Sequence, residues 1–403
     1  MVSIRGQGVS IMFEQLISQP SDKIMELMAQ YAEDARTDKL DLGVGVYKNA
    51  AGVTPIMKAV KESEEILLRI QDSKSYVGLI GSIEFSRNIG ELVLNNSVDE
   101  KRLSYAQAPG GTGALHQLLL LARATKSIGK VWISNPSWPN HQAILKHLGM
   151  NMSSYYYFDE ITCEVDFEKM LQDLQDMKES DILLLHGCCH NPTGANLNFE
   201  QWVEVTRLIQ DKNVLPFIDL AYQGFGDGLE QDVEGLNYLI KNVSEAMVAV
   251  SCSKNFGVYR DRVGVAIVVS EESKKDLVQD NLKSLNRLTF SFPPDHGAAV
   301  VNQILKDDKL KTQWKDELEE MRTNMMDLRE RLSSELHRET KSNRFNFVSK
   351  HRGMFSKLGL TSEQVNILRK DYGIYMVSDS RINVAGLRKD VINYLASAIS
   401  NVI

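Results

Sequence analysis

The chain has 403 residues, which exceeds the usual size of one domain, so we expect two domains or a large domain with a smaller one. Its 46 basic and 53 acidic residues give a net charge of −7, which argues against a nucleic-acid partner held by overall charge. The composition, 43% hydrophobic and 25% charged, is globular, and apolar runs such as Leu118–Leu121 are too short to cross a membrane.

The N-terminal residues and the cysteines indicate the cellular compartment of the protein. Met1–Ile11 contains one arginine and no apolar core long enough for a secretory signal, so we assign this segment no function. Met12 can itself be a start. The 4 cysteines do not make a disulfide framework in a chain of this length. The setting we expect is therefore the reducing cytoplasm.

Short β-rich runs alternate with stretches of helical period through the middle of the chain. The runs are Val131–Ser134, Ile182–His186, Val214–Ile218, Met247–Ser251 and Val263–Val269. The helical stretches between them include Pro139–Leu148 and Phe199–Gln210. This alternation predicts an α/β fold, with a mainly parallel sheet covered by helices on both faces. Functional residues are then expected at the carboxyl ends of the strands.

Two glycine-rich turns and one tryptophan are the first candidate binding features. The turn Gly110–Gly113 opens a predicted helix, where backbone amides and the helix field favour an anion. It carries neither a Walker A lysine nor a dinucleotide glycine pattern, and Gly43–Gly45 lacks the third glycine of a nucleotide motif. Trp138 lies beyond a strand end and can stack on a planar ring, although core filling is the commoner use of tryptophan.

The segment His186–Gly194 follows an apolar strand and has two interpretations. His186, Cys188, Cys189 and His190 are residue types that bind transition metals. Neighbouring cysteines rarely share one ion, however, and paired ligands are usually a turn or more apart. The better interpretation is a loop that positions the amide of Asn191, so we predict no metal.

Asp219 and Tyr222 follow the next apolar strand. A carboxylate at this position either caps a helix or has a chemical task. One such task is to keep the ring nitrogen of pyridoxal phosphate protonated, so that the ring accepts electrons from a substrate carbanion. Tyr222 can then hydrogen-bond the phenolate oxygen of the same ring.

Lys254 follows the strand Met247–Ser251, with the hydroxyls of Ser251 and Ser253 close by in the sequence and Gly257 after it. Desolvation or a nearby cation lowers the pKa of a lysine amine and makes it a nucleophile that can form a Schiff base with an aldehyde. A structural or phosphate-contacting lysine is the alternative. Arg262, eight residues later, is either a surface ion-pair residue or a phosphate ligand.

The pattern changes after about Phe290. Asp308–His337 is a long, charged run of helical period, whose Met and Leu spacing is typical of a core-facing stripe. From about Phe345 come short strand-like pieces and a final helix, Arg388–Val402, which predict a smaller α+β domain. The early segment Asp22–Thr54 can join that domain if the long helix returns the chain to its start.

The candidate features together supply the contacts that pyridoxal phosphate needs, and the chain resembles a class I aminotransferase of the aspartate aminotransferase subfamily. The resemblance runs from about Phe13 to the C-terminus and rests on LGVGVYKN, YVGLIGSIEF, PGGTGAL, SNPSWPNH, HGCCHNPTG, DLAYQGF, SCSKNFG, GMFS and RINVAG. It implies the type I fold of pyridoxal-phosphate enzymes. The boundaries that we expect are an N-terminal arm at 1–21, a small domain at 22–54 and 321–403, and a large cofactor-binding domain at 55–320.

The resemblance also implies the residues that hold the cofactor. Lys254 would form the Schiff base, Asp219 with the support of His141 would pair with the pyridinium nitrogen, and Tyr222 and Asn191 would hydrogen-bond the ring oxygen. Lys254, Asp219 and Tyr222 are the expected catalytic residues. The phosphate would be bound by Gly111, Thr112, Ser251, Ser253 and Arg262. Trp138 would pack on the ring and, with Gly45 and Asn191, help to hold the substrate α-carboxylate.

Two arginines and a tyrosine complete the set that the resemblance implies. Arg381 matches the arginine that binds the substrate α-carboxylate, and Arg287 matches the one that pairs with a side-chain carboxylate. In this family Tyr76, a cofactor contact, and Arg287 reach the site of the neighbouring subunit, so a homodimer is implied. Without the family, neither arginine stands out.

The chain departs from the subfamily pattern near the expected substrate site. Phe290 and Phe292 stand where the subfamily usually has an aromatic and a polar residue, and Lys357 replaces an aromatic residue after Phe355. Ser380 replaces a glycine before Arg381, and Ser75 stands where aspartate enzymes commonly have Asn. Val46, Lys48, Thr54 and Thr112 agree with the aspartate type.

Three functions follow as hypotheses. The first is reversible transfer of an amino group between L-aspartate and 2-oxoglutarate, giving oxaloacetate and L-glutamate. The second, motivated by Phe290 and Phe292, is an aromatic or broad-specificity aminotransferase. The third is a non-catalytic binding module with this fold, which would need a DNA-binding appendage, and neither end of the chain has a basic helix-turn-helix segment.

Overall fold

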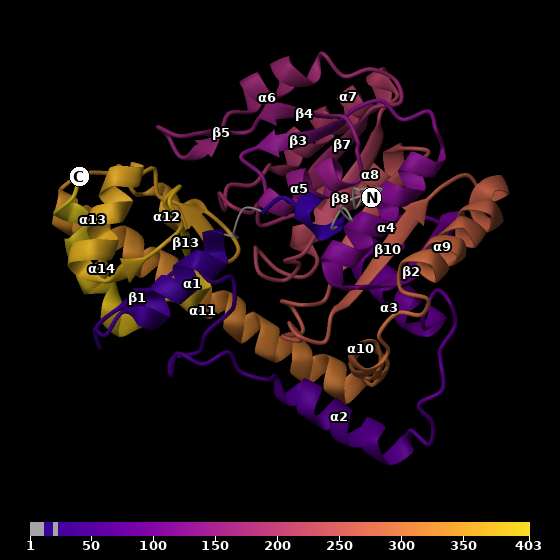
Figure 1. The fold of residues 1–403 in the computed structure, drawn as a ribbon, viewed down its shortest axis with the longest axis horizontal. Helices are drawn as coiled ribbons and strands as arrows, with labels where there is room; N and C mark the ends of the chain where they lie inside the picture. The colour runs from indigo at the N-terminus through magenta and orange to yellow at the C-terminus, as the bar shows by residue number, and fades with distance from the viewer. Residues whose placement is uncertain (1–11, 19–22) are drawn as a thin grey trace, which may run out of the picture.

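The computed structural model of the chain describes residues 12–18 and 23–403. The segment Met1–Ile11, to which the sequence gives no function, lies outside these residues. Figure 1 shows a sheet covered by helices and, beside it, a C-terminal part in yellow, with the long helix α11 (Asp308–Thr340) running between the two. Within residues 12–18 and 23–403, no helix combines the length and the apolar character that a membrane span needs.

A seven-stranded sheet forms the centre of the larger part. Its strands, in spatial order, are β2 (Leu103–Pro109), β10 (Val263–Val269), β9 (Ala246–Ser251), β8 (Leu215–Leu220), β7 (Ile182–His186), β3 (Val131–Asn135) and β4 (Met152–Tyr156). Every neighbouring pair is parallel except the two pairs that include β10. The predicted parallel sheet is thus confirmed, while β2, β4 and the reversed direction of β10 were not foreseen.

Helices cover both faces of this sheet because its strands alternate their side chains. On β9, Met247 and Ala249 pack in one hydrophobic cluster, whereas Val248 and Val250 pack in the other. The first cluster includes residues of α4 (Gly110–Ala124), α5 (Pro139–His147) and α9 (Lys275–Thr289). The second includes residues of α3 (Ile83–Leu94), α7 (Phe199–Lys212), α8 (Glu234–Asn242) and α10 (His296–Lys306). The same cluster includes residues of α2 (Lys58–Ile70) and α6 (Phe167–Leu174).

The C-terminal part joins both ends of the chain. Its elements are α12 (Phe347–Lys350), β11 (Phe355–Lys357), α13 (Ser362–Tyr372), β12 (Ile374–Tyr375), β13 (Arg381–Asn383) and α14 (Ile392–Ser400). Strand β1 (Leu40–Asp41) pairs in parallel with β12, and α1 (Lys23–Glu33) lies with these elements in Figure 1. The early segment therefore contacts the late one as expected, while the exact domain boundaries stay a prediction. The final helix begins at Ile392, later than predicted, because Lys389–Val391 forms a 3-10 turn.

A hairpin connects the edge of the sheet to the C-terminal part. Strands β5 (Phe158–Asp159) and β6 (Glu164–Val165) form it directly after β4. The buried ring of His351 lies between hairpin and β11: its Nε2 is 2.8 Å from the carbonyl oxygen of Cys163, and its Nδ1 is 3.0 Å from Ser356 Oγ. Since a carbonyl only accepts, Nε2 carries the proton and Nδ1 accepts from the serine hydroxyl. The neutral ring thus has a partner at each nitrogen.

This neutral histidine predicts a loss of stability in acid. Burial lowers the pKa of His351 to about 3, whereas an unfolded histidine titrates near about 6.5, so the unfolded chain binds more protons between these values. The free energy of unfolding therefore rises with pH through that window and falls as the pH drops below about 6.5. Between pH 7 and pH 5, we expect His351→Gln to lose about 2 kcal/mol less stability than the wild type.

Urea unfolding at the two pH values measures this difference. The matched control is His147→Gln, because His147 on α5 is exposed and its loss removes a histidine that is not buried. If the free energy of unfolding depends on pH equally in His351→Gln and the wild type, His351 is not the buried neutral histidine that lowers stability in acid.

Candidate functional site

The residues predicted for the site converge on one cavity of about 270 Å³. It lies at the carboxyl ends of β7, β8 and β9, where parallel strands of a sheet place their functional residues. Its lining includes Gly45, Gly111, Thr112, Trp138, Asn191, Asp219, Tyr222, Ser251, Ser253, Lys254, Arg262 and Arg381. Three predicted residues are not in that lining: His141, Tyr76 and Arg287.

Lys254 lies in the turn that follows β9, with its Nζ 5.0 Å from the centre of the Tyr222 ring. Burial lowers the pKa of the Lys254 amine. The negative charge of Asp219 opposes this effect, and the positive charge of Arg262 adds to it. The net direction is downward, so the amine is neutral at a lower pH than an ordinary lysine. A neutral buried amine is a nucleophile and a base.

Asp219 is a buried carboxylate on β8 that keeps its charge. Burial raises its pKa, but the hydrogen bond from His141 and the positive charge of Lys254 lower it, and the net shift is downward. His141 Nε2 lies 2.8 Å from Asp219 Oδ2, and His141 Nδ1 lies 2.9 Å from Ser137 Oγ. Because a carboxylate only accepts, the Nε2 proton of His141 is donated to Asp219. His141 therefore contacts Asp219 without lining the cavity.

His186 lines the cavity and was considered in the sequence only as a metal ligand. It stands beside Asp219 in the register of the neighbouring strands β7 and β8. Burial, with a further contribution from the charge of His141, lowers the pKa of His186 to about 3, so its ring is neutral. His186 is the last residue of the apolar strand β7, and Asp219 is the last but one of β8, so a polar residue at the end of an apolar strand is the signal that can identify both.

The start of α4 faces Arg262 and the serines that flank Lys254. Gly110 has φ +73°, and a Cβ there would lie 2.4 Å from Arg262 Nη2, so only glycine permits this approach. A Cβ on Gly111 would lie 2.9 Å from Ser251 Cβ. Arg262 Nη1 donates to Ser253 Oγ at 3.3 Å. Helix amides, serine hydroxyls and a guanidinium in one place are the donors that a phosphate requires.

The opposite wall of the cavity comes from the C-terminal part. Arg381 on β13 donates from Nη2 to the carbonyl of Gly43 at 2.8 Å and from Nη1 to Asn191 Oδ1 at 3.4 Å. Its guanidinium carbon lies 4.5 Å from the centre of the Phe355 ring, which is itself part of the lining. A Cβ on Gly45 would lie 2.9 Å from Phe355 Cζ. Arg381 and Phe355 thus face the cavity from the C-terminal part, next to the amide of Asn191 in the loop after β7.

Further lining residues escaped the sequence reasoning. They are Ile24, Leu115, Ala221, Tyr259 and Phe355, while Cys188, considered in the sequence only as a metal ligand, also lines the cavity. The hydroxyl of Tyr259 accepts a hydrogen bond from the backbone N–H of Tyr47 at 3.1 Å, and burial raises its pKa to about 12. Tyrosine side chains in a loop give no pattern in the sequence. Their role depends on contacts with residues more than 200 positions away.

Tyr76 and Arg287 lie together on the surface. The Tyr76 ring stacks on that of Phe292 with centres 4.6 Å apart, although Tyr76 is 83% exposed. The guanidinium carbon of Arg287 lies 5.8 Å from the centre of the same Phe292 ring, and its Nη1 donates to Ser291 Oγ at 2.5 Å. We name Tyr76, Arg287 and Phe292 the aromatic–arginine cluster. It is absent from the lining of the cavity of its own chain.

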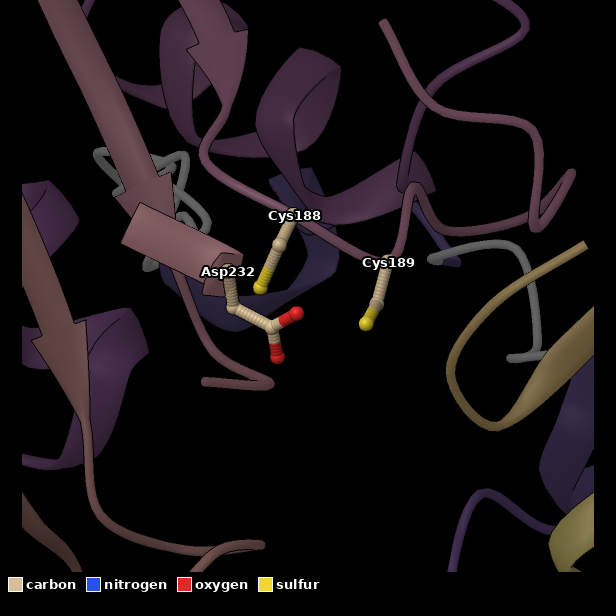
Figure 2. A group of neighbouring side chains, drawn as sticks. All are labelled: Cys188, Cys189 and Asp232. Carbon is tan, nitrogen blue, oxygen red and sulfur yellow. The ribbon is translucent and has the colours of Figure 1, made fainter. Parts of the chain in front are cut away.

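The two neighbouring cysteines meet an aspartate rather than the histidines. The thiols of Cys188 and Cys189 and a carboxylate oxygen of Asp232 lie within 4.8 Å of one another, and Figure 2 shows the three side chains turned toward a common point. Asp232 already accepts hydrogen bonds from the backbone amides of Gly224, Gly226 and Asp227. A hydrogen bond between the thiols and their burial raise the pKa of Cys188, and burial raises that of Cys189. Protonated thiols and an occupied carboxylate are poor metal donors.

The donor set of the cavity fits pyridoxal phosphate. A buried amine, an ionised buried carboxylate and a phosphate-binding group at a helix start occur together in one lining. The amine suits the aldehyde, the carboxylate suits a protonated ring nitrogen, and the α4 start suits the phosphate. Lys254, Asp219 and Arg262 are the residues that would hold these three groups.

Known proteins give an independent comparison. Residues 37–399 match the protein family described as aminotransferase class I and II. The aromatic-amino-acid aminotransferase of Paracoccus denitrificans is 47% identical over 97% of this chain and 100% of its own. The aspartate aminotransferase of Escherichia coli strain K12 is 40% identical over 96% of this chain and 99% of its own.

Solved structures agree with these relatives. An aromatic amino acid aminotransferase with 3-indolebutyric acid has a TM-score of 0.95 and 47% identity, covering 97% of this chain and 100% of its own. The aromatic-amino-acid aminotransferase of Burkholderia pseudomallei, covalently bound to pyridoxal phosphate, has a TM-score of 0.95 and 36% identity, covering 97% and 99%. The fold, the donor set and these likenesses lead to one family: the chain belongs to the class I aminotransferases, enzymes that depend on pyridoxal phosphate.

Proposed function

We propose that the enzyme transfers the amino group of both dicarboxylic and aromatic L-amino acids, with 2-oxoglutarate and L-glutamate as the second substrate pair. The observation that carries the proposal is the aromatic–arginine cluster, in which Arg287 lies against the ring of Phe292 and Phe292 stacks on Tyr76. A guanidinium pairs with a side-chain carboxylate, and the two rings offer contact area to an aromatic side chain. Relatives named for aromatic amino acids and for aspartate both support this breadth. Transfer from L-aspartate, which gives oxaloacetate, is one of its reactions.

The cofactor would be held by Lys254, by Asp219 at the ring nitrogen, and by a phosphate-binding group. That group consists of Gly111, Thr112, Ser251, Ser253 and Arg262. When bound, pyridoxal phosphate supplies an electron sink for the charge that remains on substrate Cα after its proton leaves. Trp138, Tyr222 and Asn191 complete its surroundings, and Asn191 Nδ2 donates to the Tyr222 hydroxyl at 3.4 Å.

The residues of this chain orient the substrate and move its proton. Arg381 and Asn191, which are hydrogen-bonded to each other, bind the α-carboxylate together with Gly45. Fixing the carboxylate directs the Cα–H bond toward the amine of Lys254. Because burial keeps that amine neutral to a lower pH, it accepts the proton from Cα and later returns it. Asp219 stays ionised throughout, because His141 donates to it.

Arg287 tests the proposed breadth directly. In Arg287→Ala the side-chain carboxylate of aspartate loses its charged partner, so we expect kcat/KM for aspartate to fall by about 100-fold. For phenylalanine the change should stay within about threefold, because its ring needs no charge. Steady-state kinetics with both amino acids and 2-oxoglutarate measures the two ratios.

Arg331→Ala is the matched control, since Arg331 is a half-exposed arginine that pairs with Asp327 on α11. An equal fall for both amino acids in Arg287→Ala would contradict the proposal. A wild type that uses phenylalanine at under about 1% of its aspartate rate would restrict the enzyme to dicarboxylic substrates.

His141 tests the state of Asp219. Without the hydrogen bond from His141, the burial that raises the pKa of Asp219 is less opposed, so Asp219 is protonated at a higher pH. We expect the acidic limb of the kcat/KM profile to move up by about one pH unit in His141→Leu. His147→Leu, at an exposed position of the same helix, should leave the limb in place. A uniform fall at all pH values would mean that His141 supports structure only.

The proposal includes a homodimer in which Tyr76 and Arg287 serve the neighbouring site. Leu288, which follows Arg287 on α9 and is 79% exposed, supports a covered surface at this place. Mixing Lys254→Ala with Arg287→Ala subunits should then restore aspartate transfer. Half of the dimers are hybrids with one intact site each, so about a quarter of wild-type activity is expected after exchange. No recovery would place Arg287 in the site of its own subunit.

A cytoplasmic location stays a prediction.

A further inference from the structure

The hairpin β5–β6 is attached to the C-terminal part by two ion pairs and one histidine. Lys350 of α12 pairs with Glu164 at 3.0 Å, and Lys357 of β11 pairs with Glu160. His351 adds its hydrogen bond to the carbonyl of Cys163. The two ion pairs thus join the same two elements, but their lysines lie on different segments of the C-terminal part.

Lys357 is the buried member of these pairs. Its side chain is 11% exposed, whereas the Lys350 side chain is 69% exposed. Its ammonium lies 5.9 Å from the centre of the Phe158 ring of the hairpin and contacts the carboxylate of Glu160. A buried charge is costly unless it is paired, so Glu160 is needed where Lys357 is desolvated. The exposed Lys350 pair has no such requirement.

Strand β11 connects Lys357 to Arg381. In the ladder of β11 and β13, Lys357 is directly opposite Arg381. Phe355, two residues before Lys357 and therefore on the same face, packs under the Arg381 guanidinium. The backbone N–H of Lys357 also donates to the carbonyl of Thr193, just after Asn191. One three-residue strand thus contacts Arg381 and the segment that carries Asn191.

We propose that the Lys357–Glu160 ion pair is a positioning element, which holds β11 against the hairpin and thereby sets Arg381 for the substrate α-carboxylate. The proposal rests on the proposed function in one respect, the role of Arg381. Lys357 touches no substrate in this scheme and acts through β11.

The α-carboxylate is common to every amino acid, and this fixes the kinetic pattern. Loss of the ion pair should raise KM for aspartate and for phenylalanine by the same factor. Any fall in kcat, which depends on the direction of the Cα–H bond, should likewise be the same for both amino acids. Loss of Arg287, in contrast, separates the two substrates. The two patterns are therefore distinguishable in one set of assays.

The experiment compares Lys357→Met and Glu160→Gln with the control Lys350→Met, all as holoenzymes. The first readout is the Kd of indole-3-propionate, a carboxylic acid without an amino group, measured by calorimetry so that no turnover is needed. We expect Kd, and KM for both amino acids, to rise about fivefold or more in the first two variants and to stay unchanged in the control. The double variant should be no worse than either single one. The charge-exchanged protein, Lys357→Glu with Glu160→Lys, should regain most of the affinity.

Three results would overturn the proposal. One is an equal effect of Lys350→Met and Lys357→Met, since attachment of the hairpin would then suffice. Another is additive loss in the double variant, which would mean that the two side chains act separately. The third is a normal Kd of indole-3-propionate in both Glu160→Gln and Lys357→Met. If Lys357→Met fails to fold, the Kd of Glu160→Gln alone decides. A wild type that binds indole-3-propionate but transfers no amino group would refute the proposed function and leave the positioning role to be judged by Kd.

Discussion

The site depends on the burial of two opposite charges, those of Lys254 and Asp219, at one edge of the sheet. Burial acts on them in opposite senses, because it lowers the pKa of the amine and raises that of the carboxylate. Left alone, both groups would lose their charge. His141 prevents this for Asp219 by donating to it from a ring that is itself anchored on Ser137. The result is an ionised acid beside an amine that readily becomes neutral.

The second wall of the cavity depends on a buried guanidinium far from the chemistry. Arg329 of α11 donates to the carbonyls of Val348, Gly353 and Phe355 and to Ser356 Oγ. These four acceptors fix the segment that leads into β11, whose Phe355 packs under Arg381. Ser356 in turn donates to His351. Strand β11 is thus held by α11 on one side and by the β5–β6 hairpin on the other.

Much of this arrangement was accessible from the sequence, for a physical reason. Asn191, Asp219 and Lys254 each follow an apolar run, and parallel strands bring their carboxyl ends to one edge. Local chemistry and sheet geometry therefore agree at these positions. The strand order and the reversed β10 depend on which strands find each other across long loops, and periodicity carries no such information.

The residues that needed the family, or that were missed, lie where the local signal is weak. Arg381 belongs to a strand of only 3 residues, and its placement depends on β11 and on Gly43 from the other end of the chain. Arg287 lies on the exposed side of a charged helix, where arginine is ordinary. Tyr259 and His186 line the cavity because the folded chain buries them there, which the sequence neighbours of Tyr259 do not indicate. In the proposed function, the preference for aromatic or dicarboxylic substrates would be set by surface residues that serve a second chain, and the sequence pattern of one chain does not encode that contact.

The pairing of β1 with β12 has a consequence for folding during synthesis on the ribosome. Asp41 and Tyr375 are register partners, yet 375 − 41 = 334 residues separate them along the chain. At about 5–20 residues per second, a ribosome needs roughly 15–70 s to bridge that gap. During this time the sheet can form, but Gly43 and Gly45 cannot make their contacts with Arg381 and Phe355 until these residues have left the ribosome. The cavity is therefore among the last features of the molecule to be completed, and a nascent chain carries its lysine before it can hold a substrate.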